Sequence, residues 1–125
     1  MIKCNYLILS EWINLDQITG LASIYNILEK FSNPDFPFTI GKIAMLAFFE
    51  RTSRDFSKFE IEWKIFNNDE LIKSEEFMLD FNDKFKHKWI NIFQWIDIKE
   101  PWELRFSIYS SGKEINRYII ELEKN

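Results

Sequence analysis

Residues 101–123 read PWELRFSIYSSGKEINRYIIELE, and this stretch decides the fold class. Apolar and polar residues alternate along residues 102–108 and again along residues 118–123. A period of two is that of a β-strand with one face in a core and the other in water. Ser111-Gly112 lies between the two runs and supplies a turn. The stretch therefore predicts a β-hairpin, and with it an all-β protein.

The same alternation is strictest at residues 59–65, where Phe59, Ile61, Trp63 and Ile65 are separated by charged residues. Residues 67–70, Asn-Asn-Asp-Glu, predict a hairpin turn because Asn and Asp tolerate positive φ. The strand that returns from this turn is expected to point Phe77, Leu79 and Phe81 inward. These residues predict a second hairpin with a clear core face.

Three further stretches have strand patterns. Residues 2–9 alternate, with Cys4 expected inside beside Ile2, Tyr6 and Ile8. Residues 38–49 are apolar on both parities, which is typical of a central strand that is covered on both faces. Residues 88–98 resume the extended pattern before Pro101.

Residues 11–31 allow two interpretations. Leu15, Ile18, Ala22, Tyr25 and Leu28 recur at helical spacing, which predicts a short amphipathic helix. Thr19-Gly20 followed by Ile24 and Tyr25 equally suits a strand that begins after a turn. The residues themselves leave both interpretations open.

The count is seven strands, or eight if residues 19–31 are extended, and the 125 residues suit one domain. No run of helices is available to cover a parallel sheet. The sequence therefore predicts a single β-sandwich domain over residues 1–125, with two antiparallel sheets and a possible short helix within residues 11–31.

The composition of the chain argues against several classes of function. The net charge is −4 and charges of both signs interleave, so no basic field would attract nucleic acid. The local exception is Lys84, Lys86, His87 and Lys88, which we interpret as a solvated loop. No apolar run has the roughly 20 residues of a membrane span, and no secretory signal is evident, so we expect a cytoplasmic protein. The absence of Val and the twelve Lys against four Arg suggest an AT-rich bacterial or phage genome.

Several segments together resemble an uncharacterised bacterial β-sandwich family. The segments are Cys4-Asn5-Tyr6, the run from Gly20 to Tyr25, Phe36-Pro37-Phe38, and the ending Pro101-Trp102-Glu103-Leu104-Arg105-Phe106 with Ser110-Ser111-Gly112-Lys113. The family commonly has Asp where this chain has Asn5, Gly-Glu-Tyr where it has Trp102-Glu103, and Asp-Gly where it has Ser111-Gly112. The resemblance implies a β-sandwich and an extended conformation for residues 17–31, and it implies no functional site.

The sequence contains few residues that could support catalysis. A nucleophilic triad needs a base beside Ser or Cys, and the single His lies among lysines. Zinc sites usually recruit several His or Cys ligands, and the chain has one of each. Cys4 is expected to be a small core residue, and the three isolated glycines form no phosphate-binding loop. We therefore expect a protein that is not an enzyme, with no catalytic residues, no cofactor and no metal site.

The remaining signal is aromatic. Trp89, Phe93 and Trp95 fall on one parity of residues 88–98, and isoleucines occupy the other parity. Either residues 11–31 or a loop covers the second face, or Trp89, Phe93 and Trp95 form an interface with a protein partner or a second copy of the chain. We expect a binding module that acts through protein contacts and forms a homo-oligomer. The alternative is a small-ligand pocket with aromatic walls.

Overall fold

The computed structural model describes residues 2–52 and 56–125. Within these ranges the chain forms nine strands and no helix, so there is no helix long and apolar enough to cross a membrane among these residues. The strands are β1 Ile2–Leu15, β2 Ala22–Ile27, β3 Lys30–Asn33, β4 Phe38–Arg51, β5 Lys58–Asn67, β6 Glu70–Asp80, β7 Lys86–Ile98, β8 Trp102–Ser110 and β9 Lys113–Lys124.

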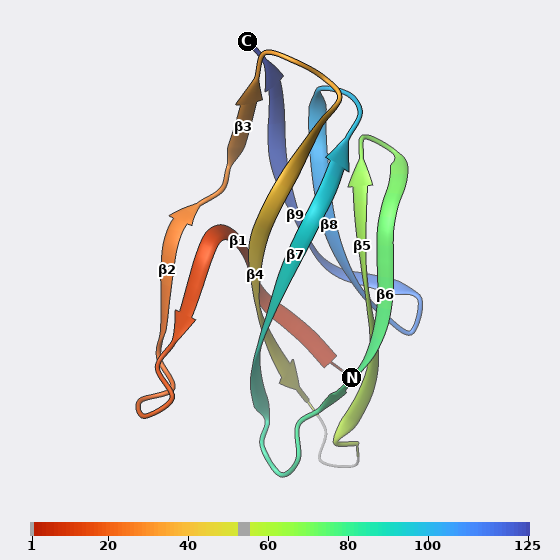
Figure 1. Ribbon diagram of the computed structural model, residues 1–125. Helices are drawn as coiled ribbons and strands as arrows, with labels where there is room; N and C mark the ends of the chain where they lie inside the picture. Colours follow the sequence, from red (N-terminus) through yellow and green to blue (C-terminus); the bar gives the residue numbers. More distant parts are fainter. Residues whose placement is uncertain (1, 53–55) are drawn as a thin grey trace.

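The strands make two sheets that pack as layers (Figure 1). Sheet A has the order β2-β1-β4-β7, and sheet B has the order β3-β9-β8-β5-β6. Neighbouring strands are antiparallel, except that β3 runs parallel to β9. The predicted all-β sandwich is confirmed, with nine strands among the described residues because residues 22–33 contribute two short ones.

The helix considered for residues 11–31 does not form. Asp16 instead begins a turn, in which its Oδ1 accepts hydrogen bonds from the backbone N–H groups of Ile18 (2.8 Å) and Thr19 (3.3 Å). Gly20 has φ 73°, a conformation that favours glycine. Ile18, at the tip, is 95% exposed. The apolar residues at helical spacing therefore belong to two strands joined by a turn, and we call residues 10–27 the β1–β2 hairpin.

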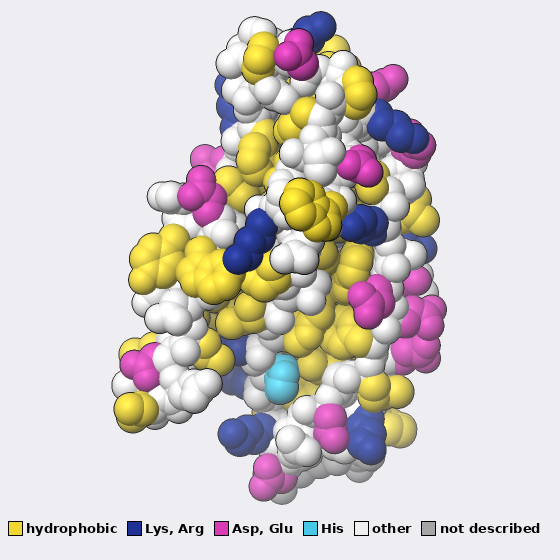
Figure 2. Space-filling model, in the orientation of Figure 1, with side chains coloured by type: hydrophobic (Ala, Val, Ile, Leu, Met, Phe, Trp, Pro, Cys, Tyr) yellow, Lys and Arg dark blue, Asp and Glu magenta, His cyan; other side chains and the backbone are white. Residues whose placement is uncertain are grey.

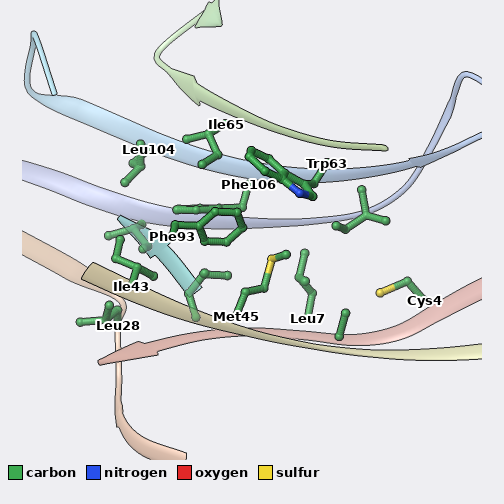
Figure 3. Close-up of a cluster of buried hydrophobic side chains, with 14 of the residues drawn as sticks. Cys4, Leu7, Leu28, Ile43, Met45, Trp63, Ile65, Phe93, Leu104 and Phe106 are labelled. Carbon is green, nitrogen blue, oxygen red and sulfur yellow. The ribbon is translucent and has the colours of Figure 1, made fainter. Parts of the chain in front are cut away.

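The core lies between the two sheets, and the alternating residues of the sequence supply it. Ile61, Trp63 and Ile65 are buried as predicted, and Phe59 packs against them. Figure 3 shows Trp63 and Phe106 of sheet B beside Phe93 of sheet A, with ring centroids 4.8 Å apart for Trp63–Phe93 and 5.4 Å for Phe93–Phe106. Cys4 of β1, Leu79 of β6 and Phe81 just after β6 are also buried in this cluster, and the predicted inward residue Phe77 packs against it.

The C-terminal hairpin forms as predicted, with Ser111 and Gly112 at positive φ in its turn. One residue of its apolar face is misplaced: Trp102 is 74% exposed and has φ 107°. The buried Asn67 holds the connection just before it. Its amide nitrogen donates to the carbonyls of Glu100 (3.0 Å) and Glu103 (3.2 Å), and its oxygen accepts from the N–H groups of Lys99 and Glu100 (3.0 Å each). This connection bends the chain at the start of β8 and turns the Trp102 side chain outward.

Candidate binding groove

A groove of about 540 Å³ lies between the tip of the β1–β2 hairpin and the main part of sheet A. Figure 2 shows the hairpin as a projection separated from the body by a notch, with basic and histidine side chains on the body's side. Its lining comes from β1, the turn at the hairpin tip, β4, and the start of β7 with the loop before it. We call this site the hairpin groove.

The apolar wall of the groove consists of Tyr6, Leu15 and Phe48. The rings of Tyr6 and Phe48 meet edge to face, with centroids 5.7 Å apart and planes at 83°. Tyr6 is 64% exposed and Leu15 is 41% exposed. An apolar or aromatic group that entered the groove would therefore bury surface now in contact with water.

A β-bulge places Tyr6 in this wall. The pairing of β1 with β4 shifts between Cys4 and Tyr6, so that Cys4 lies opposite Phe49 and Tyr6 opposite Phe48. Asn5 is the extra residue, and its amide nitrogen donates to Glu50 Oε2 at 2.8 Å. The expected alternation, in which Tyr6 and Ile8 share the core face with Cys4, is therefore wrong. A bulge re-aims side chains in this way, and here it turns both Asn5 and Tyr6 outward.

The opposite side of the groove is basic. Lys84, Lys86 and Lys88 line it together with His87. The Lys88 ammonium donates to the Gly20 carbonyl at 2.5 Å and lies 5.6 Å from the Phe48 ring centroid, so it links β7 to the hairpin tip. Within the described ranges, no carboxylate lies within 4.0 Å of the ammonium groups of Lys84 and Lys86. The predicted loop is wrong for Lys86, His87 and Lys88, which belong to β7, whereas Lys84 lies in the connection before that strand.

Of the two residue types most often recruited for catalysis, His87 lies in the groove lining and Cys4 is enclosed in the core. The His87 ring meets the buried Phe81 ring edge to face, with centroids 6.1 Å apart. Cys4 is 6% exposed, and burial raises the pKa of its thiol to about 11. Among residues 2–52 and 56–125, no group of three or more His, Cys, Asp or Glu side chains could hold a metal ion. The lining of the groove combines ammonium groups with apolar side chains, which are the groups that suit an anion next to an apolar group.

The three aromatic residues predicted as an interface do not share a face. Trp89 stacks on Phe77, with ring centroids 4.2 Å apart and planes at 12°. Phe93 is 4% exposed in the main core, whereas Trp95 is 68% exposed. The backbone causes the difference, because Trp95 has φ 57° and the inward parity changes between Phe93 and Ile96.

Strand β4 changes parity at the same place. Ile40 and Ile43 are both buried against the main core although they lie three positions apart, a spacing at which the side chains of a regular strand point to opposite faces. They lie opposite Ile96 and Phe93, so the two strands keep their register through the irregularity. The alternation of residues 88–98 predicted that Trp95 lies on the same face of β7 as Phe93, and this prediction is wrong.

The isoleucine face of β7 is covered by the chain itself, as in the alternative prediction that residues 11–31 or a loop cover the second face of this strand. Ile90 and Ile92 pack in a second apolar cluster on the outer side of sheet A. The cluster also contains Ile13, Ala22, Ile24, Ala44, Leu46 and Phe48. The β1–β2 hairpin supplies its cover, and the groove begins where that cover ends.

No family model matches the chain, and no curated protein matches it. Its fold is similar to that of a β-glucosidase from Listeria innocua in complex with glucose, with 10% identity over 98% of this chain and 16% of that chain and a TM-score of 0.53. It also matches a glycosyl hydrolase family 2 member from Bacteroides cellulosilyticus, with 14% identity over 70% of this chain and 14% of that chain and a TM-score of 0.47.

An immunoglobulin-like protein from Pseudomonas aeruginosa matches over nearly its whole length, with 5% identity, 98% of this chain, 97% of that chain and a TM-score of 0.47. The chain spans only 14% and 16% of the two glycosidases above. At these identities the similarity concerns the fold alone. The two-sheet topology defines an all-β sandwich, and it agrees with the fold that the resemblance implies.

Proposed function

We propose that the protein is a non-catalytic binding module and that the hairpin groove holds a segment of a protein partner. The observation that carries the proposal is the combination of an exposed Tyr6 ring with the ammonium groups of Lys84 and Lys86 across one groove. Aromatic side chains contribute strongly to binding when a partner removes them from water. The groove supports this role better than Trp89, Phe93 and Trp95 do, because Phe93 is buried.

The test is affinity capture from an extract of the source cell with three forms of the protein. These are the unchanged chain, Tyr6→Ala, and Met78→Ser as the control, since Met78 is 61% exposed on β6 of sheet B. We expect a captured protein that is lost with Tyr6→Ala and kept with Met78→Ser, and that binds the purified chain with the same dependence. The proposal fails if no captured protein distinguishes Tyr6→Ala from the control.

A second copy of the chain is one possible partner. Light scattering would then give a mass of twice 15.2 kDa for the unchanged chain, and Tyr6→Ala would return it to 15.2 kDa. Bacterial or phage origin and a cytoplasmic location stay predictions from the sequence.

The groove volume favours a second candidate function, the binding of a small ligand. About 540 Å³ lies in the range of roughly 300–1,000 Å³ that is usual for small-molecule sites. A small metabolite that raises the melting temperature of the unchanged chain but not of Tyr6→Ala would favour this candidate.

A further inference from the structure

We propose that the partner segment held in the hairpin groove is acidic and extended, with carboxylates that pair with Lys84, Lys86 and Lys88 and an apolar side chain against Tyr6. This inference rests on the proposed function and names the chemistry of the partner. It follows from the charges, the spacing and the apolar wall of the groove.

The charge at the groove opposes that of the whole protein. The chain has 20 acidic and 16 basic residues, yet three lysines fall within five positions and line one side of the groove. An attraction between this side and a negative segment would guide the partner to the groove, because opposite potentials steer association.

Three carboxylates lie near the lysines in the sequence or in the fold: Asp83 precedes Lys84, Glu50 lies opposite Lys86 in the β4–β7 pairing, and Asp16 lies in the hairpin turn. Glu50 accepts a hydrogen bond from Asn5. Asp16 accepts two backbone hydrogen bonds in the hairpin turn, and these hold its pKa below the usual value. Among residues 2–52 and 56–125, none of these carboxylates lies within 4.0 Å of the ammonium groups of Lys84 and Lys86, so both groups can pair with carboxylates from outside the chain.

The spacing of the lysines suits an extended segment. Lys86 and Lys88 lie two residues apart on one strand, so their side chains leave the same face about 6.6 Å apart. Carboxylates at alternate positions of an extended peptide have the same spacing. Although Lys88 donates to the Gly20 carbonyl, an ammonium has three donors and two remain.

The apolar wall of the groove indicates a second property of the partner segment, an apolar side chain. Tyr6 and Leu15 are exposed across the groove from the lysines, and Phe48 supports the Tyr6 ring edge to face. A phenyl or aliphatic side chain next to the acidic positions would therefore rest on Tyr6. A segment with charge alone would leave this wall in water.

The test measures binding of a fluorescent peptide, acetyl-Glu-Ser-Glu-Ser-Phe-Ser-amide, by anisotropy. A peptide with Lys in place of both Glu residues is the matched probe, and inorganic phosphate and ATP are competitors. We expect the acidic peptide to bind more tightly than the basic one and to weaken as salt is raised, because salt screens exposed charges.

The decisive variant is the double change Lys84→Glu with Lys86→Glu. It should weaken the acidic peptide about tenfold or more and make the basic peptide the better ligand. The control is Lys113→Glu with Lys124→Glu, an equal change in net charge at exposed positions of β9, which should change both affinities less than twofold. Circular dichroism confirms that each variant is folded.

The inference is overturned if the two peptides bind equally, or if the control pair weakens the acidic peptide as much as the groove pair does. It is also overturned if phosphate or ATP binds the groove and the acidic peptide does not. If neither peptide binds while capture of a partner still depends on Tyr6, the acidic inference fails and the proposed function stands.

Discussion

The outer faces of the two sheets differ in what their side chains contact: the outer face of sheet B faces water, and that of sheet A is covered by part of the chain. On sheet B the outward side chains are largely charged or polar, and they contact one another: Arg105 lies over the Phe66 ring (4.4 Å) and Lys64 over the Tyr109 ring (4.9 Å). On sheet A the outward residues of β4 and β7 are apolar and form a cluster of their own. The outer face of sheet B can therefore face water, whereas the outer face of sheet A is covered by the β1–β2 hairpin.

The difference teaches where a binding site can arise in a small sandwich. An outer face of mostly charged and polar residues can face water without cover. An apolar face covered by a single hairpin has a boundary where the cover ends. The hairpin groove lies at that boundary, with Phe48 belonging to both the covered cluster and the groove wall.

The largest contrast between the two faces should come from Leu46→Ala and Lys64→Ala. Leu46 has no exposed surface although it points away from the main core, so its truncation should lower the free energy of unfolding by about 2–5 kcal/mol. Lys64→Ala, on the outer side of sheet B, should change it by less than about 0.5 kcal/mol. Urea unfolding of both variants measures the difference. Equal effects would show that the outer face of sheet A is not a second core.

The second test concerns the hairpin as the cover. Ile13→Ala removes a buried side chain that contacts the outer cluster, and we expect a loss of about 2–3 kcal/mol. Hydrogen exchange should show faster exchange at β2, which pairs only with β1, and little change at β8. Uniform acceleration over both sheets would contradict a locally anchored cover.

A smaller effect on the free energy of unfolding should come from the titration of Cys4, which is buried on the inner side of β1, whereas Tyr6 on the same strand is exposed. The pKa of Cys4 in the folded chain is raised from 9.0 to about 11 by burial, so folding favours the neutral thiol. The resulting stabilisation is complete below pH 9 and is lost as the pH rises toward 11, by about 2 kcal/mol. Unfolding free energies of the unchanged chain and Cys4→Ala at pH 7, 9 and 11 measure it. A constant difference between the two chains over this range would refute the predicted titration.

The smallest effect is expected at Trp95, which is 68% exposed on sheet A. Trp95→Ser should change the free energy of unfolding by less than about 0.5 kcal/mol, whereas Phe93→Ser, two residues earlier, should prevent stable folding. Thermal melts of the two single variants separate these positions. Similar melting temperatures would mean that Trp95 is part of the sheet A cover.

Much of the fold follows from residues whose local pattern agrees with their tertiary environment. The alternation at residues 59–65, the Asn67–Asn68 turn and the C-terminal hairpin are of this kind, since burial on one face selects the same period of two. The apolar character of residues 38–49 on both parities likewise predicted a strand covered on both faces, and the hairpin supplies the outer cover.

The misplaced residues lie where the backbone leaves that period. The bulge at Asn5 and the positive φ of Trp95 both shift the parity, and the residue at each position is not the glycine that usually marks such a conformation, although Gly41 lies opposite Trp95 in β4. The groove was missed for the same reason, since Tyr6 was assigned to the core and the lysines to a loop. Lys84, Lys86 and Lys88 were the available signal, but the strand opposite them becomes a wall only through the bulge.

The position of β9 in sheet B has a consequence for how the chain is made. β9 pairs with β8, which precedes it directly, and in parallel with β3, from which most of the sequence separates it. Its Ile120 and Leu122 fill the main core. During synthesis from the N-terminus, β3 therefore cannot pair with β9 until β9 has left the ribosome, and the apolar inner positions that β9 covers stay exposed until then. Such distant contacts raise the contact order and slow folding, so this small sandwich should close late and in one step rather than strand by strand.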